Sequence, residues 1–197
     1  MQGMNELDVE SCRRMRPYTY REYVGRILWA LVNPLFRFSP RPLFGWRRLL
    51  LRLFGARIGE NAHVYPSAHI YLPWNLTLGN QASIGEWALI YNLGFVSIGD
   101  RATISHRAHL CAGTHDYRDP SLPLLRLPIS IGADAWVCSE AFIGPGRQVG
   151  DGAIVGAAAV VVHDVPAWQI VAGNPARVIK PRVLSAPEKG RRANDLC

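Results

Sequence analysis

The stretch IGDRATISHRAHLCAG, residues 98 to 113, repeats a pattern every six residues. An aliphatic residue opens each unit, as at Ile98 and Ile104, and an alanine holds the fifth position, as at Ala102. The same register runs through most of the chain. Its first positions are Ile58, Val64, Leu78, Ile84, Ile98, Ile104, Leu110, Ile131, Val137, Ile143, Val149 and Val155. Its fifth positions are Ala62, Ala68, Ala82, Ala88, Ala102, Ala108, Thr114, Ala135, Ala141, Arg147, Ala153 and Ala159, of which only Arg147 is large.

A period of six fits neither an amphipathic helix nor the alternation of an ordinary strand. It fits a short strand and a turn, wound repeatedly into a β-solenoid with the aliphatic and small residues inside. Glycine at many second positions, such as Gly79 and Gly99, favours a tight corner that a side chain would obstruct. If first and fifth positions point inward, sixth positions point outward.

The spacing is interrupted three times. Eight residues replace six after Ile70 and again after Ile90, and solenoid packing predicts that the extra residues bulge outward. The largest interruption is the segment 116–130, which leaves the coil directly after His115 and ends where Ile131 restores the repeat. His115 occupies a sixth position at the root of this excursion, so we expect it to face a cleft.

The hexads resemble those of the hexapeptide-repeat acyltransferases over residues 58–180. That resemblance implies a mainly β fold, a left-handed parallel β-helix with three hexads per coil. It also implies a homotrimer with active sites between subunits. We expect a basic helical extension over residues 1–57 and a flexible tail over 181–197.

The segment GTHDY, residues 113–117, is similar to the glycine-x-histidine segment of sugar O-acetyltransferases, above all those of the colanic-acid type. The resemblance implies that His115 is a general base that deprotonates an acceptor hydroxyl for direct attack on acetyl-CoA. Imidazole titrates near neutral pH and suits that step, and no covalent enzyme intermediate is needed. The implied acceptor is a sugar hydroxyl of an exopolysaccharide or its lipid-linked precursor.

Two further residues match the family's acceptor side. Asn92, in the bulge YNLG, corresponds to an asparagine that helps to hold the acceptor or the histidine, and an ordinary turn with a glycine shortly after the asparagine is an equally good explanation. Trp136 corresponds to a tryptophan that walls the cleft, and a trimer contact is an equally good explanation of an outward tryptophan.

The segment GNPARVIK, residues 173–180, matches the family's CoA-binding end. By resemblance, Arg177 and Lys180 meet the 3'-phosphate, and paired cations near a phosphate are chemically sensible. The pantetheine groove would be lined by Ser139, Ala157 and His163. Val162-His163-Asp164 replaces the threonine-lysine pair of many relatives, which removes a hydroxyl from the groove.

The charge is concentrated at the N-terminus. Residues 1–57 hold eleven arginines, no lysine and four acids, a net of +7, and the remainder of the chain is neutral. We expect helices over 20–32, ended by Asn33-Pro34, and over 43–54, ended by Gly55. Arginines interleaved with leucines and aromatics over 20–54 suit peripheral contact with an anionic membrane, and packing on the solenoid is the competing explanation.

Other features limit the alternatives. The apolar run ILWALVNPLF is too short to span a bilayer, and no nucleic-acid module accompanies the arginines. Four scattered cysteines and no signal-like start favour the cytoplasm.

Three alternative functions stay open. The first is a xenobiotic or small-sugar acetyltransferase of the same fold. The second is a carbonic-anhydrase-type zinc enzyme using His106, His109 and His115, although we expect no metal. The third is a non-catalytic scaffold.

Overall fold

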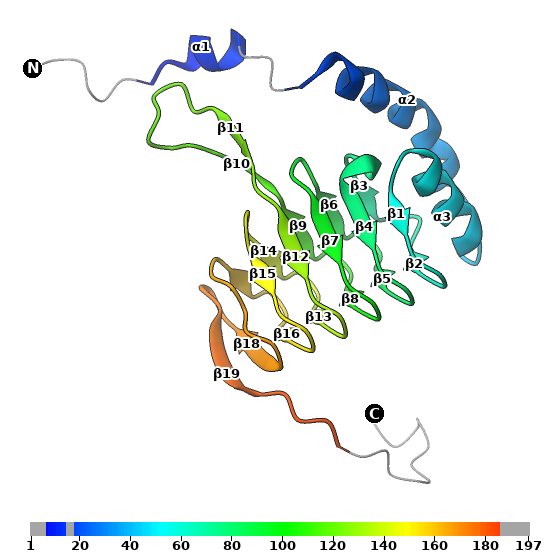
Figure 1. The fold of residues 1–197 in the computed structure, drawn as a ribbon, viewed down its shortest axis with the longest axis vertical. Helices are drawn as coiled ribbons and strands as arrows, with labels where there is room; N and C mark the ends of the chain where they lie inside the picture. The colour runs from blue at the N-terminus through cyan, green and yellow to red at the C-terminus, as the bar shows by residue number, and fades with distance from the viewer. Residues whose placement is uncertain (1–6, 15–17, 186–197) are drawn as a thin grey trace, which may run out of the picture.

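The computed structural model describes residues 7–14 and 18–185. Helices α1 (Val9–Arg14), α2 (Tyr20–Arg37) and α3 (Phe44–Leu53) come first, and the rest of the chain winds into a solenoid of short strands (Figure 1). The strands are β1 (Arg57–Ile58), β2 (His63–Val64), β3 (His69–Ile70), β4 (Leu76–Leu78), β5 (Ser83–Ile84), β6 (Leu89–Tyr91), β7 (Val96–Ile98), β8 (Thr103–Ile104), β9 (His109–Cys111), β10 (Gly113–His115), β11 (Leu124–Arg126), β12 (Ile129–Ile131), β13 (Trp136–Val137), β14 (Phe142–Ile143), β15 (Gln148–Val149), β16 (Ile154–Val155), β17 (Val160–Val161), β18 (Gln169–Ala172) and β19 (Arg177–Pro181), with one 3-10 turn, η1 (Pro73–Asn75).

The solenoid has three sides, each a parallel sheet. We call them sheet A (β1-β4-β7-β12-β15), sheet B (β2-β5-β8-β13-β16-β18, to which β19 adds antiparallel) and sheet C (β3-β6-β9-β14-β17). The chain visits A, B and C in turn, so each coil lies on the previous one in register, as Leu78 pairs with Ile98. The predicted solenoid with helices at its N-terminal end is therefore confirmed.

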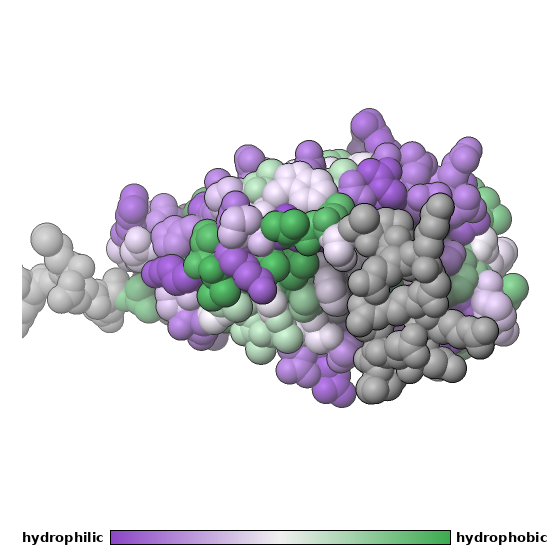
Figure 2. Space-filling view, turned by 90° about the horizontal axis from the view of Figure 1, so that it is seen from below, coloured by the Kyte–Doolittle hydropathy of each residue, from purple (hydrophilic) through white to green (hydrophobic). Residues whose placement is uncertain are grey.

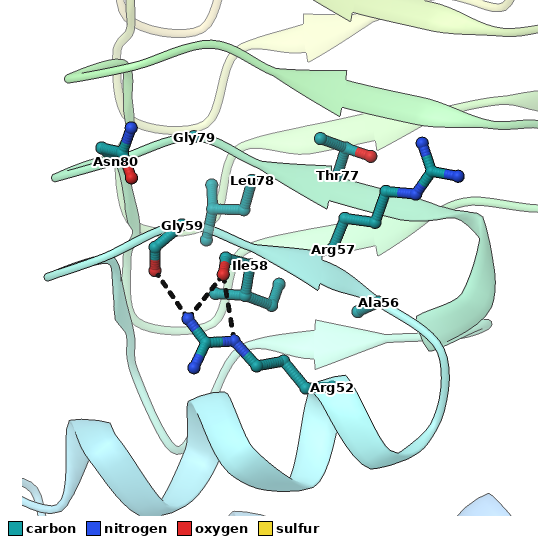
Figure 3. Close-up of a pocket in the computed structure, with 9 residues that line it drawn as sticks. All are labelled: Arg52, Ala56, Arg57, Ile58, Gly59, Thr77, Leu78, Gly79 and Asn80. Carbon is teal, nitrogen blue, oxygen red and sulfur yellow. Dashed lines mark hydrogen bonds between the residues drawn. The ribbon is translucent and has the colours of Figure 1, made fainter.

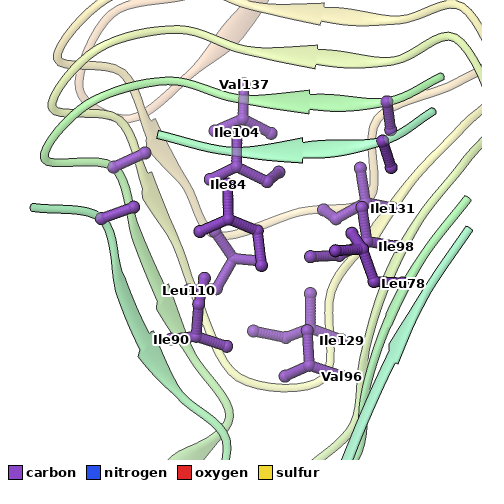
Figure 4. Close-up of a cluster of buried hydrophobic side chains, with 14 of the residues drawn as sticks. Leu78, Ile84, Ile90, Val96, Ile98, Ile104, Leu110, Ile129, Ile131 and Val137 are labelled. Carbon is purple, nitrogen blue, oxygen red and sulfur yellow. The ribbon is translucent and has the colours of Figure 1, made fainter. Parts of the chain in front are cut away.

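The core is the stack of hexad residues. All twelve aliphatic first positions are buried, and equivalent residues from successive coils, such as Ile84, Ile104 and Val137, lie one above another (Figure 4). The ten alanines at fifth positions are buried as well. Thr114 and Arg147 are only half-buried, so the two exceptions in the sequence are exceptions in the structure.

The corner from sheet A to sheet B explains the second-position glycines. A Cβ on Gly79 would lie 2.4 Å from the Asp100 carboxylate of the next coil, because that carboxylate accepts a hydrogen bond of 2.7 Å from the Asn80 backbone N–H. Asp151 bonds the Ala133 N–H at 2.8 Å in the same way. The Asp or Asn that follows these glycines thus links coil to coil, a signal that sequence analysis did not use.

Helix α2 is longer than predicted. A capping box of Thr19 and Glu22 starts it, but it continues through Pro34 to Arg37, so the predicted end at residue 32 is wrong. A proline in the last turn removes one backbone donor, and the buried Phe36 ring, 5.9 Å from that of Trp29, holds the extra turn on the solenoid. Helix α3 agrees with its prediction, and Gly55 ends it with φ of 88°. Helix α1 was not predicted.

The arginines of α3 close the N-terminal end of the solenoid. The first coil has no coil before it to bond its backbone, a situation that exposes polar groups at any sheet edge. Arg47, Arg48 and Arg52 donate to these groups instead, and Figure 3 shows Arg52 reaching the edge of β1. Their acceptors are the carbonyl oxygens of Ile58, Gly59, Ala62 and Val64. Packing on the solenoid therefore accounts for these three charges.

Candidate active site

His115 lies on a hairpin that projects from the solenoid (Figure 1). Strand β10 pairs antiparallel with β11, with His115 opposite Leu124. The chain rejoins sheet A at β12, where Ile129 already pairs with Val96. The predicted coil register of Thr114 and His115 and the predicted limits of the excursion are therefore wrong: the chain leaves the coil before Thr114 and returns before Ile131. His115 is exposed, as expected.

All three irregularities of the repeat stack at one corner, where the chain passes from sheet C to sheet A. The extra residues leave the coil as predicted but bury one another, because Leu72 and Leu93 are almost fully enclosed. Gly113, at the foot of the hairpin, packs on this layer, since a Cβ there would lie 3.0 Å from Leu93. The two eight-residue units thus form the base on which the His115 hairpin stands.

Asn92 joins the layers of this base. Its side chain is fully buried; it accepts a hydrogen bond of 3.0 Å from the Leu72 N–H and donates one of 2.6 Å to the Leu72 carbonyl. The geometry therefore favours a structural role for Asn92, which is to hold the two bulges together. A fully buried side chain gives no support to direct contact with an acceptor.

We expect Asn92→Ala to lower the free energy of unfolding by about 2–4 kcal/mol, because it leaves a buried N–H and a buried C=O without partners. Urea unfolding followed by circular dichroism measures the change. Asn75→Ala is the matched comparison, since Asn75 is half-buried and bonds only backbone carbonyls at 2.9 and 3.3 Å. An equal, small loss in both variants would contradict the role given to Asn92.

The His115 ring is held by the backbone of its own hairpin. Its Nδ1 lies 2.5 Å from the Leu122 carbonyl oxygen. A carbonyl can only accept, so Nδ1 carries the proton and Nε2 of the neutral ring keeps a free lone pair. Leu122 adopts φ of 44°, a conformation that few non-glycine residues use. No sequence pattern signals a backbone carbonyl, so this partner could not be predicted.

Neither nearby acid orients the histidine. Asp116 accepts from the Arg118 N–H at 3.0 Å, and Asp119 accepts from the N–H and hydroxyl of Ser121. These hydrogen bonds hold the pKa of Asp119 below its usual value. Both carboxylates therefore stabilise the loop, and the Leu122 carbonyl orients the His115 ring in their place.

The N-terminal segment braces the hairpin from outside. The Asp8 N–H donates to the Pro120 carbonyl at 2.9 Å, and Arg126 of β11 pairs with Glu22 of α2 at 2.5 Å. Burial opposes ionisation of Glu22, but its bonds to Arg126 and Thr19 prevail and lower its pKa. The hairpin is thus fixed to both the solenoid and α2.

Trp136 and Ser139 lie at a different corner of the solenoid, around the passage from sheet B to sheet C. Trp136 is exposed on β13 and donates from Nε1 to the Ser105 hydroxyl at 2.9 Å. The Ser139 hydroxyl lies 3.0 Å from His106 Nδ1. The turn that carries Ala157 stacks on this one, because the Ala158 N–H donates to the Ser139 carbonyl. Three predicted ligands therefore share one edge, away from the corner that carries His115.

His163 and Arg177 come together near the C-terminal end. They line one pocket of about 250 Å³, whose other residues are Asp164, Val165, Val171, Ala176 and Val178. Lys180 is exposed on the same strand as Arg177. A cation such as Arg177 beside a pocket with an apolar wall fits the phosphate end of a nucleotide cofactor.

The three histidines of the zinc alternative do not form a centre. His106 bonds Ser139, His115 bonds Leu122, and the His109 ring stands edge-on to Phe142. Among the residues that the structure describes, no three His, Cys, Asp or Glu side chains are grouped to hold a metal ion.

His109 should make stability depend on pH. Burial lowers its pKa from 6.5, and Nε2 is buried with no partner among the described residues. The folded state therefore favours the neutral ring, so this contribution is present above pH 6.5 and is lost as pH falls through the lower folded value. We expect the free energy of unfolding to drop below about pH 6.5.

We expect a shallower drop in His109→Leu, because the variant has no imidazole to protonate at this position. Leucine should fit there, since Leu89 holds the equivalent position of the previous coil. Denaturant unfolding at pH 7.5, 6.5 and 5.5 measures it. Some dependence should persist, because burial and the charge of Arg37 also lower the pKa of His69. Identical pH profiles in wild type and variant would contradict the assignment to His109.

The chain is similar in sequence to two proteins of Escherichia coli K12. It is 42% identical over 158 residues, 80% of this chain and 87% of the relative, to WcaF, which bears the name of a colanic acid biosynthesis acetyltransferase. It is 30% identical over 137 residues, 68% of each chain, to galactoside O-acetyltransferase. No family model matches. Among solved structures, a galactoside acetyltransferase in complex with coenzyme A superposes with a TM-score of 0.75 at 25% identity, over 92% of both chains.

Proposed function

Because the chain belongs to the hexapeptide-repeat acetyltransferase family, we propose that it acetylates a sugar hydroxyl of an exopolysaccharide or of its lipid-linked precursor. Its fold is the left-handed parallel β-helix, and it is an acetyl-CoA-dependent O-acetyltransferase. The name of WcaF supports a polysaccharide acceptor over a small sugar or a xenobiotic alcohol.

The hydrogen bond from His115 to the Leu122 carbonyl is the observation that carries the proposed mechanism. It leaves the lone pair of Nε2 available, and in the proposed mechanism an acceptor hydroxyl donates to it. His115 takes the hydroxyl proton while the oxygen attacks the thioester carbonyl. The tetrahedral intermediate then collapses, the C–S bond breaks, and the imidazolium returns the proton to the sulfur of CoA. The products are the acetyl ester and CoA.

The proposed donor site runs from Ser139 and Ala157 to the pocket of His163 and Arg177, and Trp136, which we keep as a wall of the acceptor cleft, stands at the same edge. The small side chain of Ala157 leaves room along this edge, and Lys180 adds a second cation near Arg177. Acetyl-CoA supplies the acyl group there. The chain's own part is to bind its phosphates by charge and to lead the pantetheine along the edge.

A trimer would bring the two halves of the site together. Within one chain His115 leaves the corner between sheets C and A, whereas Trp136, Ser139 and Ala157 lie around the corner between sheets B and C. Two corners of one rigid prism cannot meet. We therefore propose a homotrimer in which His115 of one subunit faces the donor edge of its neighbour, with a cleft between subunits.

A panel of acceptors tests the proposed function. Purified protein and acetyl-CoA are incubated with a colanic-acid-type repeat unit, free or lipid-linked, with maltose, with a galactoside and with chloramphenicol. We expect acetyl ester on the repeat unit, detected by mass spectrometry with release of free CoA. Transfer to the small sugars or to chloramphenicol alone would reject the proposed acceptor. No transfer to any of them, with acetyl-CoA bound, would favour the scaffold alternative.

A further inference from the structure

Helix α2 presents an apolar face to solvent as well as to the solenoid. Its buried side holds Trp29 and Phe36. Surface helices ordinarily turn polar residues outward. Here the outward stripe, at helical spacing, is Tyr20, Tyr23, Val24, Ile27, Leu28, Leu31, Leu35 and Phe38, all exposed. The helix is therefore apolar on both sides, and one side is uncovered.

Helix α3 extends the same surface. The Trp46 indole donates to the Leu35 carbonyl of α2 at 3.1 Å, which ties the two helices together. A shallow hollow of about 320 Å³ lies between them, with Phe38 and Leu43 on its sides. The exposed apolar residues of α3 and the turn before it are Leu43, Trp46, Leu49 and Leu53. We call these twelve side chains the α2–α3 apolar face.

The size of the α2–α3 apolar face is unusual. Its twelve large side chains are 37–83% exposed. At roughly 150–250 Å² for a fully exposed large side chain, they present on the order of 1,000 Å². The largest apolar patch of a typical monomer is about 300–600 Å². A surface of this extent calls for a partner.

The charges around the α2–α3 apolar face indicate whether its partner is anionic or cationic. From residue 20 to residue 57 the chain has eight arginines and one acid, Glu22, which is paired with Arg126; three of these arginines, Arg47, Arg48 and Arg52, bond the first coil, and five remain. Arg21 is exposed on α2, and Arg41 is exposed in the turn before α3, where it pairs with Glu86 of the solenoid at 3.4 Å. A second copy packed symmetrically on this face would bring arginine toward arginine. An anionic surface would instead gain from the same charges.

We propose that the α2–α3 apolar face docks on the surface of a bilayer that contains anionic lipid. Large apolar side chains bordered by arginines are the composition of helices that lie in the membrane interface. Among the described residues, no helix is long and apolar enough to cross a bilayer, which fits lateral docking. Trp29 donates to the Ile70 carbonyl at 2.9 Å, so α2 docks as part of the rigid body and does not insert alone.

The position of α2 gives the docking a purpose beyond the acetyl transfer itself. The helix is about 27 Å long. Its N-terminal turn holds Glu22 against Arg126 of the hairpin, and its C-terminal half packs on the first coils. Docking would therefore fix the His115 hairpin at a set distance from the lipid. An acceptor anchored in that membrane would reach His115 by moving along the surface.

Flotation of the full-length protein with vesicles tests the docking without any acetyl donor. The vesicles are phosphatidylcholine alone or phosphatidylcholine with about one quarter phosphatidylglycerol. We expect binding to the anionic vesicles, weaker binding to neutral ones, and a loss of binding as salt rises. Leu31→Gln/Leu35→Gln should lower the bound fraction about tenfold, because these side chains are 71% and 58% exposed and support no core.

Val183→Gln/Leu184→Gln is the matched control. These residues are 85% and 62% exposed beyond β19. Figure 2, seen from below the view of Figure 1, shows that apolar side chains reach the surface on that face of the molecule as well. The control should bind vesicles like wild type, and both variants should keep the wild-type melting temperature. Equal binding by all three proteins would overturn the proposal, and so would no binding to either vesicle. If Leu31→Gln/Leu35→Gln instead splits an oligomer while wild type ignores vesicles, the face binds a second copy.

Discussion

Replacing His115 with alanine should lower kcat for acetyl transfer by about 10²–10⁴-fold, the range that a positioned general base supplies. The acceptor hydroxyl would then have no group to take its proton during attack on the thioester. The dissociation constant for acetyl-CoA should stay within about twofold of wild type, because Ser139 and Ala157 lie at another corner of the prism and the pocket of His163 and Arg177 lies near its C-terminal end. Turnover assays with the responding acceptor, together with calorimetric titration of CoA, measure both quantities.

Asp116→Asn is the matched control for this loss. The carboxylate follows His115 directly but bonds only the backbone of its own loop, so its removal should leave kcat close to wild type. Mixed trimers sharpen the test. His115→Ala subunits combined with subunits blocked at the donor edge by Ser139→Trp should regain some activity if sites form between subunits. Full activity of His115→Ala would rule out the general base, whatever the membrane assay shows.

Replacing Arg47 with alanine should cost about 3 kcal/mol of stability or more, the largest effect that we expect of a residue outside the site. The guanidinium is fully buried under the first coil. Its Nε donates to the Val64 carbonyl at 2.6 Å. Its other acceptors are the Ser39 hydroxyl and the carbonyls of Pro40 and Arg41. Alanine would leave these groups unpaired and open a cavity beneath Phe44, whose ring stacks on the guanidinium.

Urea unfolding measures this loss of stability. Two further variants serve as a partial rescue and as a control. Burial lowers the pKa of the Arg47 guanidinium, yet such a group remains charged near neutral pH. Arg47→Lys should therefore recover only part of the stability, since an ammonium lacks the planar set of donors. Arg57→Ala, at an exposed arginine of β1, should change stability by no more than about 0.5 kcal/mol. A similar small change in Arg47→Ala would show that the cap is dispensable.

Local periodicity made the solenoid predictable. Each hexad reports its own inward positions, so Ile84 and Ala88 could be assigned to the core without knowledge of any other coil. The end of α2 was not predictable in this way. Pro34 is a local stop signal, and it is overridden by the packing of Phe36 on Trp29, a contact that no spacing rule describes.

In the candidate site, too, some features could be predicted from the sequence and others depend on contacts that it does not encode locally. The exposure of His115 was predicted, but the reason given for it does not hold, because His115 lies on a hairpin with pairing of its own and not at a sixth position of the coil. The orienting carbonyl of Leu122 and the internal bonding of Asn92 depend on conformation and on stacking between coils. The arginine-rich composition suggested a partner, but only the folded structure separates the arginines that cap the first coil from those at the surface.

The repeat changes length at one corner only, between sheets C and A, and this corner is where new loops can be inserted. Successive inward residues are six apart at the other two corners, whereas from sheet C to sheet A the spacing is eight, eight, twenty-one, six and four along the chain. At the A-to-B corner an added residue would break the carboxylate links between coils. New loops, including binding peptides or altered acceptor contacts, should therefore be grafted at the C-to-A corner, where the prism already accepts chains of different length.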